Sequence, residues 1–178
     1  MNIAVFGSSK PRPGSPNYEE AFSLGSLLGE AGHTVLTGGY GGTMEAVSKG
    51  ASLAGSHVIG VTCKEIADWR GSTANPWVKE ELCAPTLQDR IITMLNSCDA
   101  AIALPGGAGT LTEIMLAWNR LLIEADHPKP LILIGSGWKQ VINALYSSQK
   151  EHILPTDKRW LSFAENPREA LNCLNHAS

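Results

Sequence analysis

The chain has 178 residues, 43% of them hydrophobic, and a formal net charge of −3 with acidic and basic residues interspersed. This length suits one domain spanning residues 1–178 and is short for two. The sequence has no basic run that would follow a nucleic-acid backbone or an anionic membrane surface, so we expect neither partner and favour a small ligand.

Cysteine and histidine positions bear on compartment and metal binding. The cysteines are scattered without a C-x-x-C pair, which favours reduced thiols in an intracellular protein. The chain opens on a strand-like run rather than a signal peptide, and no apolar segment reaches membrane-spanning length. The histidines, which show no metal-ligand spacing, are His33, His57, His127, His152 and His176. We therefore predict a cytoplasmic protein with no metal site.

The first sixty residues alternate between strand and helix patterns. Residues 2–6 predict a strand that ends in Gly7, Ser8 and Ser9, small residues that suit a ligand crevice. A Pro- and Gly-rich loop leads to a helix from residue 17 to Gly32. A strand at 33–36, a glycine-rich turn, a helix at 43–53 and a strand at 58–61 follow, which predicts right-handed parallel crossovers.

The next segment, residues 62–84, has no clear period, and we expect an excursion that carries specificity rather than framework. Residues 85–97 then predict a helix with Met94 in its apolar stripe. Arg90 falls roughly 40° from Met94, at the border of that stripe. From this position alone, the favoured interpretation is a guanidinium that reaches a surface carboxylate.

The central stretch, residues 100–118, predicts an anion site. An apolar strand at 100–104 is stopped by Pro105, and a turn containing Gly106, Gly107 and Gly109 leads into a helix that starts at Thr110. Such a turn directs several backbone N–H groups and the positive end of a helix dipole to one point. The simplest ligand is a nucleotide phosphate.

Glu113 lies in the first turn of that predicted helix, and two interpretations are open. Thr110 and Glu113 have the spacing of a capping box. From this spacing alone, the capping box is the favoured interpretation of Glu113. Alternatively, the Glu113 carboxylate faces the ligand beyond the phosphate, where it holds sugar hydroxyls or stabilises positive charge during bond cleavage.

The remaining elements complete an α/β fold, a Rossmann-like doubly wound parallel sheet with helices on both faces. We expect a strand at 131–135, a helix at 137–147, an edge strand at 160–163 and a helix at 167–174. In the strand order 3-2-1-4-5, a crevice opens at the carboxyl ends of strands one and four. This order brings residues 7–9 and 105–107 together, with residues 38–42 as a wall.

Residues 105–113, PGGAGTLTE, resemble the PGGxGTxxE signature of the LOG-type phosphoribohydrolases, often labelled lysine decarboxylases. The spacing of Arg90 to Pro105 and the position of Met94 also match the family's pattern. The second glycine turn is similar to the family's GGGxxGLMG, with departures at Thr37, Thr43 and Glu45, and the family's HQRK around the arginine is QDRI here.

This resemblance implies hydrolysis of the N-glycosidic bond of a nucleoside 5′-monophosphate, such as a cytokinin riboside 5′-monophosphate or AMP, without metal or redox cofactor. Glu113 would hold ribose hydroxyls and stabilise an oxocarbenium-like transition state, and Arg90 would orient Glu113 and the ribose. The substrate-binding residues would be Gly7, Ser8, Ser9, Gly38, Gly39, Gly42, Met94, Gly106, Gly107, Gly109 and Thr110.

The family resemblance also implies a homodimer formed through the helices beside the site. The apolar residues that we expect to contribute are Ile114, Met115, Ala117, Trp118 and Leu122.

A different class of function stays open, a non-catalytic nucleotide or molybdenum-cofactor binding or carrier protein that uses the same crevice. The departures around Arg90 and in the second glycine turn keep it open. An NAD-dependent oxidoreductase is disfavoured because GSSKPRPG follows the first strand instead of G-x-G-x-x-G. Nothing resembles a pyridoxal phosphate lysine, which disfavours a decarboxylase.

Overall fold

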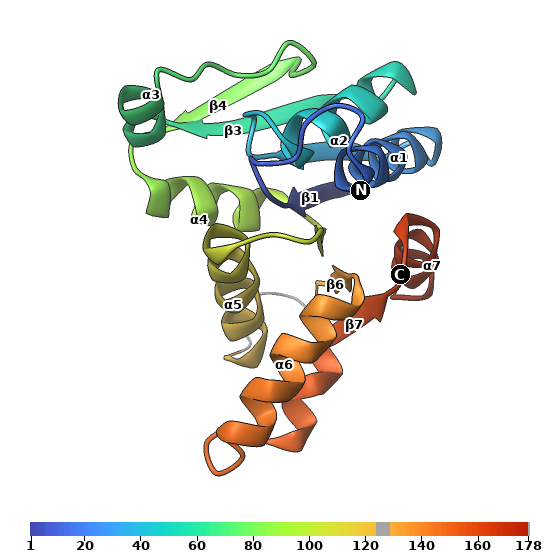
Figure 1. Cartoon of the computed structure of the whole chain (residues 1–178), viewed down its shortest axis with the longest axis vertical. Helices are drawn as coiled ribbons and strands as arrows, with labels where there is room; N and C mark the ends of the chain where they lie inside the picture. The colour runs from blue at the N-terminus through green and yellow to red at the C-terminus, as the bar shows by residue number, and fades with distance from the viewer. Residues whose placement is uncertain (124–128, 178) are drawn as a thin grey trace.

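A seven-stranded parallel sheet forms the centre of the computed structural model, which describes residues 1–123 and 129–177 (Figure 1). Its strands are β1 (Asn2–Phe6), β2 (Thr34–Thr37), β3 (Val58–Cys63), β4 (Glu80–Ala84), β5 (Ala100–Ala103), β6 (Leu131–Ile134) and β7 (Leu161–Ala164). They lie in the order β4-β3-β2-β1-β5-β6-β7, and all neighbours are parallel. The order predicted for the five central strands is confirmed.

Helices cover both faces of the sheet. They are α1 (Pro16–Glu30), α2 (Thr43–Leu53), α3 (Lys64–Arg70), α4 (Leu87–Ser97), α5 (Ala108–Leu122), α6 (Ser136–Ser148), α7 (Pro167–Ala177) and the 3₁₀ helix η1 (Pro155–Trp160). Helices α1, α2 and α7 pack on one face, and α4, α5 and α6 on the other (Figure 1). This arrangement confirms the Rossmann-like α/β fold. Among the described residues, no helix is both long and apolar enough to cross a membrane.

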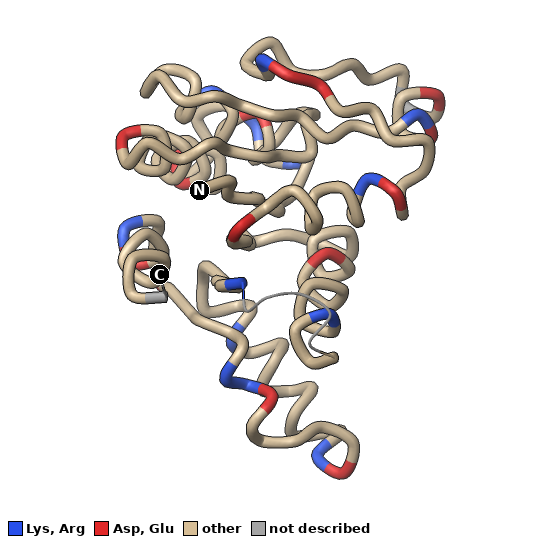
Figure 2. Tube along the Cα trace, turned by 180° about the vertical axis from the view of Figure 1, so that it is seen from behind, with Lys and Arg blue, Asp and Glu red and all other residues tan. Residues whose placement is uncertain are grey.

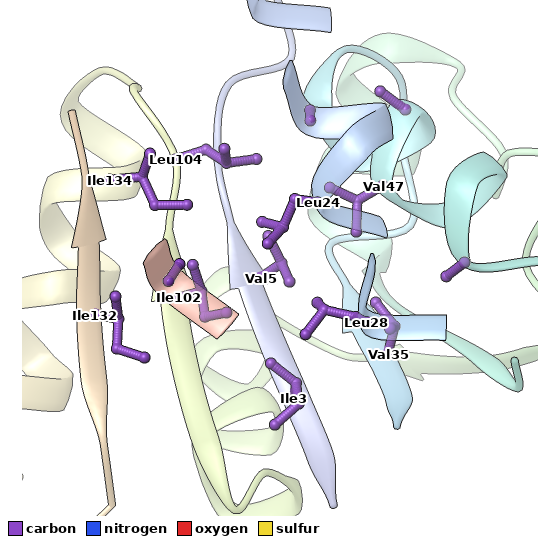
Figure 3. Packing of buried hydrophobic residues seen from close by; sticks show 14 of the residues in the cluster. Ile3, Val5, Leu24, Leu28, Val35, Val47, Ile102, Leu104, Ile132 and Ile134 are labelled. Carbon is purple, nitrogen blue, oxygen red and sulfur yellow. The ribbon is translucent and has the colours of Figure 1, made fainter. Parts of the chain in front are cut away.

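The core consists of two apolar layers, one on each face of the sheet. Ile3 and Val5 of β1 point toward Leu24 and Leu28 of α1 (Figure 3). Side chains of β1 alternate in direction, so Ala4 and Phe6 belong to the layer beneath α4 and α5. Because helices cover both faces, neither set is exposed, and the strand is apolar at every central position.

Glycine allows α1 and α2 to approach closely. A Cβ atom added at Gly25 would collide with the carbonyl group of Val47 in α2, and one added at Gly50 would collide with the carbonyl oxygen of Phe22 in α1. Backbone therefore packs against backbone where these helices cross.

We predict that Gly25→Ala lowers the free energy of unfolding by about 1–3 kcal/mol, because the new methyl group forces α1 and α2 apart. Urea denaturation monitored by circular dichroism measures the change. Gly137→Ala, in the first turn of α6, is the matched control because an added Cβ atom there meets nothing within 4 Å. Equal stability of the two variants would contradict this account of the helix contact.

One predicted segment is wrong. Residues 62–84 contain the end of β3, helix α3 and the edge strand β4 rather than an irregular excursion. Glu80 and Glu81 begin β4 and are exposed. Because edge strands tolerate charged residues, β4 lacks the apolar pattern by which a strand is predicted. Glu80 contacts His57, with Oε2 2.8 Å from Nε2, and Thr62 donates a hydrogen bond to Glu81. Other boundaries differ from prediction by a few residues.

The surface carries charges of both signs. Figure 2 shows Lys and Arg interspersed with Asp and Glu along the chain, as in the sequence.

The four cysteines are free thiols, as predicted. Of the five histidines, His127 lies outside the described residues.

Candidate active site

Three loops converge at the carboxyl ends of the central strands. The loop after β1 follows Phe6, whose carbonyl oxygen accepts a hydrogen bond of 3.0 Å from the N–H of Leu104 in the loop after β5. The loop after β1 contacts the start of α2 through Thr43, whose N–H donates to the Ser8 carbonyl oxygen at 2.8 Å. Strands one and four of the predicted order correspond to β1 and β5. The predicted crevice therefore lies at the carboxyl ends of β1 and β5, and the turn after β2 is beside it.

Two surface cavities flank the start of α5. The first, of about 400 Å³, is called here the Glu113 cavity, and the second, of about 680 Å³, the Lys10 cavity. The Glu113 cavity is lined by Gly7, Ser9, Tyr40, Met44, Glu65, Ile66, Trp69, Leu87, Arg90, Gly109, Thr110 and Glu113. The Lys10 cavity is lined by Ser8, Lys10, Pro11, Arg12, Ser15, Asn17, Pro105, Gly106 and Gly107.

The start of α5 is open to both cavities. The helix begins at Ala108 after the N-cap Gly107, so the N–H groups of its first turn lack intrahelical acceptors. A Cβ atom at Gly107 or Gly109 would meet nothing within 4 Å, which leaves this turn accessible. Gly106 differs, because its Cα packs against the Thr110 side chain. Exposed N–H groups at the positive end of a helix dipole form a suitable anion site.

Glu113 is a buried carboxylate in the second turn of α5, and its side chain is 9% exposed. The capping-box interpretation is wrong because the helix starts earlier than predicted, with Gly107 rather than Thr110 as its N-cap. Burial raises the pKa of Glu113 to about 7, although the adjacent Arg90 guanidinium lowers it. Glu113 therefore changes charge near neutral pH.

Arg90 is buried as well, so the predicted contact with a surface carboxylate is wrong. Its Nε donates a hydrogen bond to the Val61 carbonyl oxygen at 2.7 Å, and Nη2 lies 3.8 Å from the Met44 sulfur. The guanidinium carbon lies 5.9 Å from the centre of the Tyr40 ring. Nη1 is 3.5 Å from Oε1 of Glu113. These contacts hold one edge of the guanidinium toward Glu113 in the cavity.

Three of the four glycines of the second turn, Gly38, Gly39 and Gly42, were predicted to bind the substrate. A Cβ atom at Gly38 would collide with Nη2 of Arg90 and with the Met44 sulfur. Gly39 and Gly42 adopt φ values of 75° and 73°, which favour glycine, and a Cβ atom at Gly42 would collide with the Ser8 carbonyl oxygen. None of the three is among the residues described above as lining the two cavities. Gly38 therefore makes room for Arg90 and Gly42 for the loop after β1, whereas Gly39 lies against Gly60 and Thr62 of β3.

The structure does not bring Met94 to the site. Its side chain is fully buried in the apolar layer beneath α4, together with Ile91 and Leu95. Met94 therefore supports the helix that carries Arg90.

Three residues that support or line the candidate site, Asn75, Tyr40 and Trp69, were not predicted from the sequence. Asn75 donates through Nδ2 to the carbonyl oxygens of Gly39 and Tyr40 at 3.0 and 3.1 Å, which holds the second glycine turn. The Tyr40 hydroxyl donates to the Cys63 carbonyl oxygen at 3.0 Å and accepts from the Cys63 N–H. The aromatic residue within the run GGYGG was the one available signal. Trp69 of α3 is 75% exposed and lines the Glu113 cavity.

The apolar residues of α5 lie mostly inside the chain. Ile114, Ala117 and Trp118 are buried in the layer beneath α4 to α6, and Met115 and Leu122 pack against it. The Trp118 indole N–H donates to the Asp157 carbonyl oxygen of η1 at 3.1 Å. These side chains therefore pack mostly within the chain and do not form the exposed apolar surface that we expected at a dimer contact.

Protonation of Glu113 makes stability depend on pH. The pKa of this carboxyl is about 7 in the folded chain against an ordinary value of 4.5, so the folded state keeps a proton that the unfolded state releases in this window. The free energy of unfolding of the native chain, relative to that of Glu113→Gln, should therefore fall as pH rises from about 5 to 8, by up to about 3 kcal/mol. Urea denaturation of both proteins across this range measures the difference, and a constant or rising difference would contradict it.

Together, the fold and the site define a class: a Rossmann-like α/β protein with an open helix N-terminus beside a buried arginine–glutamate pair. Within this class, the chain belongs to the SLOG cluster4 family, a LOG-like family whose sequence model matches residues 1–159. The predicted family resemblance is confirmed.

Two relatives bear the name cytokinin riboside 5′-monophosphate phosphoribohydrolase. The Arabidopsis thaliana protein is 32% identical over 182 aligned positions, which cover 97% of this chain and 80% of the relative. The Mycobacterium tuberculosis protein is 29% identical over 167 positions, covering 88% and 87%. The molybdenum cofactor binding protein from Rippkaea orientalis shares the fold, with a TM-score of 0.77, 23% identity and coverage of 99% and 96%.

Proposed function

We propose that this protein hydrolyses the N-glycosidic bond of a nucleoside 5′-monophosphate to a free base and ribose 5-phosphate. The observation that carries the proposal is the buried Arg90–Glu113 pair, which opens onto a cavity beside the first turn of α5. A phosphate at that turn and a sugar at the carboxylate match the phosphate and the adjoining ribose of such a substrate.

Each group has a role in the proposed reaction. The N–H groups of Gly107, Gly109 and Thr110 bind the phosphate. The Glu113 carboxylate accepts hydrogen bonds from ribose hydroxyls and stabilises the positive charge that develops as the C1′–N bond breaks. Arg90 holds that carboxylate in place. Water adds to C1′, the electrons of the C1′–N bond leave with the base, and one proton of the water is transferred overall to the base nitrogen, which gives ribose 5-phosphate and a neutral free base.

The proposed base is a purine, as in AMP or a cytokinin riboside 5′-monophosphate. The names of the relatives support this class. The lining of the Glu113 cavity also supports it, because Ile66, Trp69 and Leu87 contribute apolar side chains to it. Such side chains suit the flat face of a base and an apolar substituent on it.

Chromatographic detection of free base and ribose 5-phosphate tests the proposal. The purified protein is incubated with AMP, cytokinin riboside 5′-monophosphates and pyrimidine nucleoside monophosphates. We expect release of a purine base from at least one substrate, in equal amount with ribose 5-phosphate. The absence of release from all of them would contradict the proposal.

A second candidate is a nucleotide or molybdenum-cofactor carrier that binds without turnover. Two observations favour it: the fold shared with a molybdenum cofactor binding protein, and the sequence QDRI where the hydrolase pattern has HQRK. Tight binding of a nucleotide or pterin without base release would support this carrier.

We also propose that the protein is a cytoplasmic homodimer. The exposed apolar side chains of Leu87 and Ile92 on α4 and Trp69 on α3 support self-association beside the site. Light scattering at micromolar concentration tests it, and a monomer would contradict it.

A further inference from the structure

The Glu113 cavity is lined by residues that follow four adjacent strands of the sheet. Helix α3 begins directly after β3 and α5 begins after β5, and strands β2 and β1 lie between β3 and β5. Because neighbouring strands are about 4.8 Å apart, the carboxyl ends of β3 and β5 are separated by about 14 Å. Ser9 after β1 and Tyr40 after β2 also line the cavity. A length of this order suits an extended nucleoside 5′-monophosphate with its phosphate at α5 and its base at α3.

Helix α3 contributes a carboxylate and apolar side chains to this cavity. Glu65 and Trp69 are four residues apart, so they are neighbours on one face of α3, with Ile66 beside them. Trp69 is 75% exposed, so a flat ligand placed against it would cover an aromatic ring that water now contacts. A base stacked on Trp69 would therefore have its edge near Glu65.

The Glu65 carboxylate is held by the neighbouring helix. Its Oε2 atom accepts a hydrogen bond of 2.8 Å from the N–H of Leu87, the first residue of α4. A carboxylate offers about four acceptor positions, and this contact uses one of them. Acceptor positions therefore remain for a ligand.

The charges of the cavity favour one direction for a nucleotide. Arg90, the one cation in its described lining, has Nη1 3.5 Å from Oε1 of Glu113. Glu65 is the second carboxylate of this lining, and a negative group there repels a phosphate and attracts hydrogen-bond donors. The base, rather than the phosphate, is the part of the substrate that suits Glu65.

Adenine has a single group that can donate to this carboxylate. The ring nitrogens of the base carry no hydrogen in an adenine nucleotide, so the 6-amino group supplies its only N–H donors. An adenine with one substituent on that amino nitrogen keeps one N–H, and an adenine with two substituents keeps none. A carboxylate at this position can therefore distinguish the two kinds of substitution.

We infer that Glu65 is a specificity-determining residue, which accepts a hydrogen bond from the 6-amino group of the base and so requires at least one N–H there. This inference rests on the proposed function, because it assumes the phosphate at the start of α5 and the ribose at Glu113. Hydrogen bonds to a charged acceptor are among the stronger ones in proteins. A site built to make such a bond rejects a ligand that lacks the donor.

Two isomeric substrates test the inference. N⁶-ethyl-AMP and N⁶,N⁶-dimethyl-AMP have the same composition, but only the ethyl compound has an N–H on its amino nitrogen. The native chain should release the base from N⁶-ethyl-AMP with a kcat/KM at least about tenfold higher than from the dimethyl isomer. Glu65→Ala should reduce this ratio to within about threefold. Equal kcat/KM for the two isomers in the native chain, or an unchanged ratio in Glu65→Ala, would overturn the inference.

Two further variants separate recognition of the base from support of the fold. Glu65→Gln keeps an oxygen acceptor for the Leu87 N–H, and it should still lower the ratio because a neutral amide is a weaker acceptor than a carboxylate. Asp68→Ala removes an exposed carboxylate of the same helix that is not part of the described lining, and it should keep the native ratio. Thermal denaturation confirms that the variants are folded. A ratio lowered equally by Asp68→Ala would contradict a specific role of Glu65.

Binding measurements distinguish failure of this inference from failure of the proposed function. Calorimetric titration of Glu113→Gln should show the same preference of at least about tenfold for N⁶-ethyl-AMP, and Glu65→Ala in that background should remove it. If AMP is hydrolysed but the isomers are not distinguished, only the inference fails. If N⁶-ethyl-AMP binds more tightly in a manner that depends on Glu65 but no nucleotide releases its base, the role of Glu65 is confirmed and the hydrolase is not.

Discussion

Glu113→Gln should lower the turnover of nucleoside 5′-monophosphates by about 10²–10³-fold while the chain stays folded. Glutamine keeps the shape and one oxygen of the side chain but removes the negative charge beside the proposed oxocarbenium-like transition state. The effect should appear in kcat, because the charge develops only as the C1′–N bond breaks. Base release at saturating substrate measures it.

The same residue should set the pH dependence of activity. Because the carboxylate is the active form and its pKa is about 7, kcat/KM should fall as pH decreases below about 7. Glu113→Gln should show no such decline. Glu30→Gln, which removes an exposed carboxylate at the end of α1, is the matched control for charge and should keep native activity. Turnover within twofold of native in Glu113→Gln would disprove the proposed role.

Arg90→Ala should lower kcat/KM by roughly 10²-fold or more and shift its acid limb to higher pH. The shift follows because the Arg90 charge lowers the pKa of Glu113, so its removal leaves the carboxyl protonated over a wider range. The variant also leaves the Val61 carbonyl oxygen without the Nε donor. Activity profiles from about pH 5 to 9, with thermal denaturation as a folding check, measure both effects.

Two further variants distinguish charge from position. Arg90→Lys retains the positive charge but not the planar group that contacts Val61, Met44 and Glu113 together, so it should recover little activity. Gly38→Ala retains Arg90 but places a methyl group where Nη2 lies, and should also lower activity. An acid limb that moves to lower pH in Arg90→Ala, or native activity in Gly38→Ala, would contradict this arrangement.

Most of the sheet could be predicted because its strands carry local signals. The run around Ile102 and that around Ile132 are apolar throughout, as buried parallel strands are, and glycine turns mark their ends. The edge strand β4 could not be predicted, because an exposed edge accepts charges such as Glu80 and loses the apolar pattern. The pairing of β4 with β3 depends on tertiary contacts, which the local sequence does not reveal.

The sequence predicted which loops meet at the candidate site, and it predicted less well the contacts of the side chains there. The glycine run after β5 predicted a turn followed by a helix, because such a turn is a local feature of the backbone, although the helix starts at Ala108 rather than at Thr110. The environment of Glu113 was not predictable from spacing, since its burial and its contact with Arg90 depend on how α4 and α5 pack. Asn75 gave no local signal, because its partners at Gly39 and Tyr40 are distant in the chain.

The position of β1 in the middle of the sheet has a consequence for how the chain folds. β1 pairs with β2 on one side, but its other neighbour is β5, where Ile3 lies opposite Ala100. About a hundred residues must therefore be synthesised before β1 is enclosed, and such distant pairings form slowly. Until then the strand has an open, apolar edge, which is a site for aggregation. Refolding yield should consequently fall with protein concentration, and nascent chains that end before β5 should depend on chaperones.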